Sequence, residues 1–286
     1  MFKKKEEKHI TDQDVKRTLP HNRKEVFFDL LRNRKMALFS LSCFTFMFFI
    51  PLAVDLIYFN LLEGVAIADE KYEYLFSMIF YSMLIMIPCM LVGFLGLVGA
   101  FYTAKKMVWQ EGTMIAVDFF KGIKENWKQA LINGLIFAII LFGLVVGSSY
   151  LLIMSKAAPI LTGIGIGAIV LVFLLFGMVT ALNFAQMVYY ENSYLVTTKN
   201  SFCFLGLLHW KVLVLFLLST GGVIALACIN FVTLIIGLFL FAVLNSVVVI
   251  IYTLLSHHAF DKYINQEHYP EMVGKGLYKL EDQKEA

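Results

Sequence analysis

The chain has 286 residues, of which 59% are hydrophobic and 16% are charged, and its mean hydropathy is +0.76. Soluble domains carry about 25% charged residues, so a water-soluble fold could not bury this much apolar surface. The net charge of +3 comes from basic residues beside apolar stretches, where anionic lipid headgroups attract them. We therefore expect a lipid bilayer as a partner and no nucleic acid.

Charge-free stretches of about 20 residues predict helices that cross a bilayer. The stretches are continuously apolar, which favours helices over a barrel, because barrel strands alternate in polarity. The long gap between Lys211 and Asp261 is best folded into a hairpin that turns near Ile229, Asn230 and Phe231. We predict an all-α polytopic membrane protein with about six spans, at residues 36–59, 75–103, 129–153, 159–187, 211–229 and 232–256.

The distribution of Lys and Arg predicts the orientation, because basic loops stay in the cytoplasm. Only Lys71 and Lys156 fall outside the N-terminal segment, the second and fourth connections and the C-terminal tail. We expect a plasma-membrane protein with both ends in the cytoplasm and no cleavable signal. Its parts are a basic segment with an interfacial helix at 1–35, a transmembrane domain at 36–258 and a cytoplasmic tail at 259–286.

A weak repeat precedes the odd-numbered spans. The three segments are VFFDLLRNRKMAL at 26–38, FFKGIKENWKQAL at 119–131 and FCFLGLLHWKVLV at 202–214. The recurrence predicts three units, each a cytoplasmic interfacial helix followed by a transmembrane hairpin. The alternative is that basic, aromatic junctions resemble one another in any membrane protein, because Trp and Lys anchor helices at the interface.

The middle copy has the clearest helical period, with apolar residues at every fourth position and charged residues opposite. We expect the surface helices to contact partner proteins, because they present aromatic and basic side chains together. The candidate residues are Phe27, Asn33, Lys35, Phe119, Phe120, Ile123, Lys124, Asn126, Trp127, Lys128, Trp210 and Lys211.

Four residues are candidates for a transport route. Asp55 is the one carboxylate inside a predicted span, and an intramembrane charge is costly in hydrocarbon. The alternative is that Asp55 reaches the outer interface or pairs with Lys71 or Lys156. Pro88, Gly221 and Gly222 would expose backbone carbonyls if they break their helices, although ordinary kinks are the better explanation.

The sequence offers little for catalysis. It contains no phosphate-binding loop and no H-E-x-x-H or G-x-S-x-G motif. His257 and Asp261 are spaced i, i+4, but two ligands do not make a metal site. The cysteines, at positions 43, 89, 203 and 228, lack a paired spacing and are expected to fill space. We therefore expect no cofactor and no enzymatic activity.

Residues 87–131 contain IPCMLVGFLGLVGAFYTAKKMVWQEG and VDFFKGIKENWKQAL. This stretch resembles the YesL-like family of bacterial membrane proteins, which shows a span with proline and glycine, an aromatic-small-Tyr junction, and a surface helix with Phe-Phe and Asn-x-Lys-Gln-Ala. The resemblance covers about residues 28–255, whereas the basic N-terminal segment and the charged tail depart from the family pattern. It implies association with carbohydrate uptake systems and carries no catalytic residues.

The leading hypothesis is therefore a noncatalytic accessory or scaffold subunit of a membrane transport assembly for carbohydrate uptake. Transporter permeases are the expected partners, and the sequence is also compatible with a homo-oligomer. One alternative is that the protein is itself a carrier or channel for a small solute or an ion. A second alternative is an intramembrane enzyme that acts on lipid through His257 and Asp261.

Overall fold

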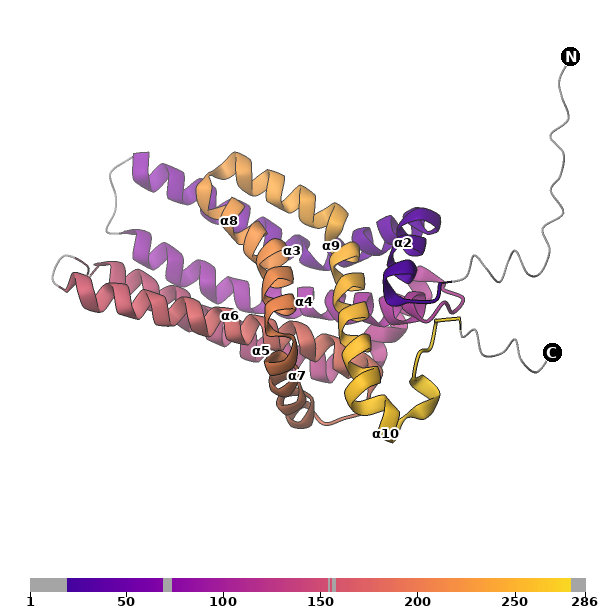
Figure 1. Cartoon of the computed structure of the whole chain (residues 1–286). Coiled ribbons are helices and arrows are strands. Elements are labelled where there is room, and N and C mark those ends of the chain that lie inside the picture. Colours follow the sequence, from indigo (N-terminus) through magenta and orange to yellow (C-terminus); the bar gives the residue numbers. More distant parts are fainter. Residues whose placement is uncertain (1–19, 69–73, 154, 156–157, 279–286) are drawn as a thin grey trace, which may run out of the picture.

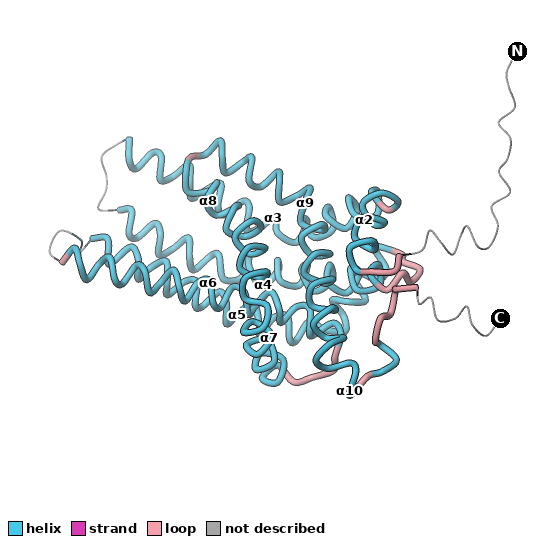
Figure 2. Tube along the Cα trace, viewed as in Figure 1, coloured by secondary structure: helices cyan, strands magenta, loops and turns pink. Residues whose placement is uncertain are grey.

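The computed structural model describes residues 20–68, 74–153, 155 and 158–278. All regular structure in this part of the chain is helical, and six helices are long and apolar enough to cross a membrane (Figures 1 and 2). The predicted all-α polytopic fold is confirmed. The main helices are α2 (Arg23–Asn33), α3 (Lys35–Ala68), α4 (Leu75–Val108), α5 (Ile115–Ile153), α6 (Pro159–Tyr189), α7 (Tyr194–Phe216), α8 (Gly222–Ile229) and α9 (Phe231–Phe260).

The second helix of the bundle, α4, packs against α3, α5, α6 and α9 and so forms its centre. Its glycines allow this close packing. A Cβ atom at Gly93 or Gly96 would lie within 2.8 Å of Phe49 or Phe48 on α3, and one at Gly99 would lie 2.8 Å from the Phe119 carbonyl on α5. Small residues at helix interfaces let backbones approach in this way.

Three glycines in the half of α5 and α6 remote from the α4–α5 connection lack such close contacts. A Cβ atom built at Gly143, Gly163 or Gly167 would meet nothing within 4 Å. These three glycines therefore make no close helix contact within the described residues.

The last two predicted spans form the expected hairpin. Helix α7 continues through a π-helical segment at Leu217–Gly221 into α8, which ends at Ile229. Asn230 then caps α9, because its side chain accepts from the Thr233 N–H at 2.9 Å and the Thr233 hydroxyl accepts from the Asn230 N–H at 3.1 Å. This reciprocal capping box explains why the turn falls at the predicted position.

Figure 1 shows α9 changing direction part-way along its length, so that its second half and α7 both run across the direction of α3 to α6. The buried hydroxyl of Ser42 on α3 bonds to backbone atoms in the middle of α9. It donates to the Val243 carbonyl at 2.9 Å and accepts from the Ser246 N–H at 3.2 Å. This contact ties α3 to the middle of α9.

Only the first of the three predicted surface helices is a separate element. Arg34 interrupts the helix between α2 and α3. The other two copies continue without a break into the following spans, because α5 already begins at Ile115 and α7 at Tyr194. The pattern of a distinct surface helix before each hairpin therefore holds for one copy of three.

Anchoring side chains lie at two levels along the long helices. Tyr58 follows Lys35 by 23 residues on α3, Lys105 follows Tyr81 by 24 on α4, and Tyr150 follows Trp127 by 23 on α5. At a rise of 1.5 Å per residue these spacings equal about 35 Å, slightly more than the hydrocarbon core of a bilayer. We call the level of Lys35, Lys105 and Trp127 the basic end, and the opposite level the tyrosine end.

Candidate functional site

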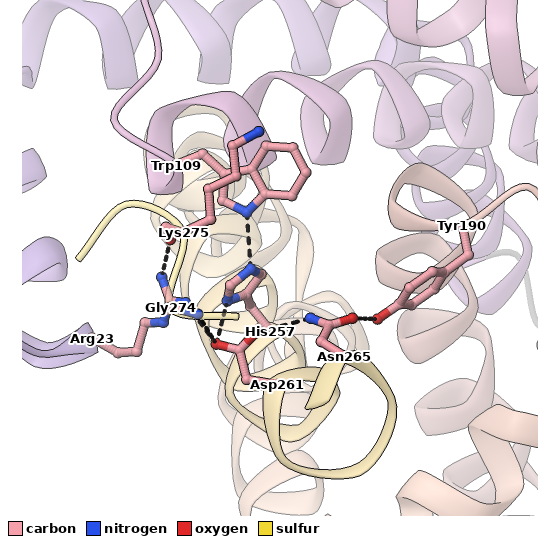
Figure 3. Close-up of polar contacts among 8 residues, drawn as sticks. All are labelled: Arg23, Trp109, Tyr190, His257, Asp261, Asn265, Gly274 and Lys275. Atoms are coloured by element: carbon pink, nitrogen blue, oxygen red, sulfur yellow. Dashed lines mark hydrogen bonds and ion pairs between the residues drawn. The ribbon is translucent and has the colours of Figure 1, made fainter. Parts of the chain in front are cut away.

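The polar side chains gather where several connections meet at the basic end. The site contains the start of α2, the α4–α5 connection, the end of α6, the end of α9 and the segment 270–278 (Figure 3). Residues Arg23, Trp109, Tyr190, His257, Asp261, Asn265, Gly274 and Lys275 form it, and we call this set the clasp.

His257 lies at the centre of the clasp and is fully buried. The Nε1 atom of Trp109 donates to Nε2 of His257 at 2.9 Å. Since an indole N–H only donates, Nε2 must accept, and the proton of the neutral imidazole lies on Nδ1. Nδ1 is 3.3 Å from Oδ2 of Asp261 and makes no hydrogen bond there, so this contact is electrostatic.

Asp261 joins three parts of the chain. Its Oδ2 atom accepts from Nη2 of Arg23 at 2.9 Å and from the Gly274 N–H at 3.3 Å, and its Oδ1 atom accepts from Nδ2 of Asn265 at 2.8 Å. The side chains of Arg23 and Asp261 are only 12% and 16% exposed. A part-buried charge pair of this kind needs additional hydrogen bonds to offset desolvation, and the Asn265 and Gly274 contacts supply them.

Asn265 extends the clasp to α6. Its Oδ1 atom accepts from the hydroxyl of Tyr190 at 2.6 Å, just beyond the end of that helix. Burial raises the pKa of Tyr190 above its usual value, so the phenol stays protonated and keeps its role as donor. Residues 261–265 form a π-helical turn, a feature often found at functional positions.

The C-terminal segment packs against the rest of the clasp. Arg23 donates to the Lys275 carbonyl at 2.8 Å, and Nζ of Lys275 lies 2.9 Å from Glu111 and 3.7 Å from the centre of the Trp109 ring. Gly276 has a φ of +85°, and a Cβ atom there would lie 2.3 Å from the Val108 carbonyl. Only glycine fits this turn without displacing the segment.

The clasp is built to hold elements together. Trp109 occupies the one nitrogen of His257 that could accept a proton from a substrate, and Asp261 already accepts from three donors. General-base catalysis needs a base within reach of the reacting proton. Within the described residues no group of three or more His, Cys, Asp or Glu side chains is arranged for a metal ion.

The predicted partner-contact residues lie on separate elements. Phe120, Trp127 and Trp210 are 53%, 45% and 69% exposed. The remaining exposed candidates are Asn33, Lys35, Lys124, Lys128 and Lys211, and the half-buried ones are Phe27, Ile123 and Asn126. Helix α2 packs on α3, α4 and α9, whereas α7 packs mainly on α6, so the three groups do not form one cluster.

Phe119 is an exception among these candidates. It is fully buried, and its ring lies 5.6 Å from Phe44 and 5.5 Å from Phe48, both on α3. Its prediction as a partner-contact residue is wrong, because the α5 face that carries it packs against α3 and α4 within the chain.

The transport candidates are scattered. Asp55 is 7% exposed, and its Oδ2 atom accepts from the Ser82 hydroxyl at 3.4 Å. Pro88 is exposed within an unbroken α4, and Gly221 ends the π-helical segment with Gly222 continuing as α8. The predicted broken helices are therefore absent at these positions. Lys71 and Lys156, the expected partners of Asp55, lie outside the described residues.

Most of the clasp was not predicted. The i, i+4 spacing singled out His257 and Asp261, and the structure places them in contact. Arg23, Trp109 and Lys275 were missed because they lie far away in the sequence. A local signal existed only in the C-terminal segment, where Gly274 and Gly276 both adopt positive φ angles, as closely spaced glycines in a polar segment often do.

These observations define a multi-pass membrane protein whose basic end is held by a buried polar clasp. No family model, no curated protein and no solved structure matches the chain. The resemblance to the YesL-like family therefore stays a prediction.

Proposed function

We propose that the chain is a noncatalytic scaffold or accessory subunit of a membrane transport assembly, and that this assembly takes up carbohydrates. The basic end is placed in the cytoplasm of a plasma membrane, in line with the Lys and Arg bias. Transporter permeases are the proposed partners.

The proposal rests on two features of the basic end: its polar groups bind one another, and aromatic residues beside them stay exposed. The clasp engages Trp109, His257 and Asp261 with one another or with neighbouring segments. The aromatic residues Phe120 and Trp127 remain exposed at the start of α5. A hydrogen-bonded base with exposed aromatic side chains beside it is suited to recognition, because aromatic anchors provide much of the energy of protein interfaces.

The test is copurification from the native host in mild detergent, followed by mass spectrometry. We expect a permease at near-equal abundance with the wild type and its loss with Trp127→Gln and Phe120→Gln combined. The matched control is Tyr150→Gln, which alters an exposed aromatic residue at the tyrosine end of the same helix. Recovery of the chain alone, or equal recovery of partners with all variants, would overturn the proposal.

A second candidate function, as a carrier or channel, is favoured by one observation. Asp55 is buried in a span, and among the described residues its side-chain hydrogen bond comes from Ser82. Intramembrane carboxylates commonly mark ion or proton pathways. Ion flux through purified protein in liposomes that falls with Asp55→Asn would support this function, whereas the absence of flux with the wild type would remove it.

A further inference from the structure

His257, at the centre of the clasp, is an ionisable group that the scaffold function leaves unused. An imidazole in an open chain has a pKa of about 6.5, so its charge changes just below neutral pH. In the folded chain the side chain of His257 is fully buried. Its Nε2 atom accepts the Trp109 indole N–H at 2.9 Å, and within the described residues its Nδ1 atom has no hydrogen-bond partner. The folded site therefore fits the neutral imidazole.

A second proton on His257 would oppose the Trp109 contact. An imidazolium donates from both ring nitrogens and an indole N–H only donates, so two donors would face each other across 2.9 Å. One of the two rings must then move away. His257 lies within α9, whereas Trp109 is the C-cap of α4, where the chain leaves that helix. We therefore expect the indole of Trp109 to be displaced.

The surroundings of His257 give a second positive charge little compensation. Oδ2 of Asp261 lies 3.3 Å from Nδ1, but it already accepts from Arg23 at 2.9 Å. A buried charge without a partner of its own is costly. The charged and titratable groups around the imidazole are Asp261 beyond the end of its own helix, Arg23 on α2, Lys105 on α4, Glu111 in the α4–α5 connection, Tyr189 on α6 and Lys275 in the C-terminal segment.

Trp109 also supports the C-terminal segment. Nζ of Lys275 lies 3.7 Å from the centre of its ring, and a Cβ atom built at Gly276 would lie 2.9 Å from its Cα atom. Displacement of Trp109 would remove the surface on which the segment rests. We propose that the clasp is an acid-sensitive switch, in which protonation of His257 displaces the Trp109 indole and releases residues 270–278. This inference is independent of the scaffold function.

Another histidine at the segment responds to acid in the opposite direction. Nδ1 of His21 lies 3.2 Å from the Tyr278 carbonyl. A protonated imidazole donates from this nitrogen, so protonation of His21 preserves its bond to the end of the segment. Release of the segment by acid is therefore assigned to His257.

The test is hydrogen–deuterium exchange of the full chain in detergent at pH 7.5 and pH 5.5, corrected for the intrinsic effect of pH on amide exchange. At one pH unit below the open-chain pKa of His257, exchange at residues 270–278 should be about tenfold faster. His257→Gln should remove this acceleration, because a glutamine amide does not titrate. His258→Gln is the matched control, because His258 is the exposed neighbour, and it should keep the acceleration.

Trp109→Phe keeps the test valid if His257→Gln fails to fold. Without the indole N–H, a second proton on His257 meets no opposing donor, so the acceleration should be smaller than in the wild type. Equal exchange of the wild-type segment at the two pH values would overturn the proposal. The same is true of an acceleration retained in full by His257→Gln or Trp109→Phe, or one that extends equally over α4, because acid would then loosen the whole bundle.

Discussion

The indole of Trp109 donates to Nε2 of His257 across 2.9 Å, although the two residues are 148 positions apart. This single bond joins the α4–α5 connection to the end of α9 and determines which nitrogen of His257 carries its proton. The orientation of His257 toward Asp261, and through it the position of the C-terminal segment, follows from this contact.

Trp109→Phe should lower the stability of the folded protein. Phenylalanine keeps an aromatic ring beside Lys275 but leaves Nε2 of the buried His257 without a donor, which costs about 1–3 kcal/mol. Thermal unfolding in detergent measures the effect. Trp210→Phe is the matched control, because Trp210 is 69% exposed and its loss should change little. Equal unfolding temperatures for the two variants would contradict the assignment.

Asp261→Asn should release the C-terminal segment. The neutral amide leaves the Arg23 guanidinium part-buried without its carboxylate, which costs about 3 kcal/mol for a buried pair. We expect faster hydrogen–deuterium exchange at residues 270–278. Glu125→Gln removes one partner of the exposed Lys121–Glu125 pair and should leave exchange unchanged. Slow exchange retained in Asp261→Asn would count against the clasp.

Gly276→Ala should displace the same segment for a steric reason. Its φ of +85° and the 2.3 Å approach of a built Cβ atom to the Val108 carbonyl both exclude alanine. Gly206→Ala is the control, because a Cβ atom there meets nothing within 4 Å and alanine favours helix. Limited proteolysis near Lys275 should accelerate only for Gly276→Ala; identical cleavage of both variants would show that the segment is not docked as described.

Ser42→Ala should weaken the crossing of α3 and α9. It removes a buried hydroxyl that donates to the Val243 carbonyl and accepts from the Ser246 N–H, a loss that costs about 1–2 kcal/mol. Thermal unfolding measures the loss. Ser77→Ala, at an exposed position of α4, should be neutral, and an equally neutral Ser42→Ala would disprove the role of this hydroxyl.

The membrane-spanning helices were predictable from sequence because each needs only a local run of apolar residues. The turn at Asn230 was also predictable, since the charge-free gap has the length of a hairpin and Asn caps helices. The continuity of α5 from Ile115 into the span could not be predicted from sequence. Its first turns carry lysines and a Trp that suggest an interface, but Phe119 is held in the bundle by Phe44 and Phe48, and that packing depends on distant residues.

The clasp shows the same limit for the site. A helical spacing of four brought His257 and Asp261 together in the prediction, because one turn of helix determines that contact. No local rule pairs Arg23 with Asp261 or Trp109 with His257, since their approach depends on how α2, α4 and α9 pack at the basic end.

The central claim is that the basic end of α5 contacts a partner protein, and site-specific photocrosslinking in the native host tests it most directly. A photoreactive phenylalanine analogue would replace Trp127 in one strain and Tyr150, at the tyrosine end of the same helix, in another. We predict a crosslink from position 127 to a transporter permease and none to that protein from position 150. Crosslinks to lipid alone from position 127, or the same protein crosslinked from both positions, would contradict the account.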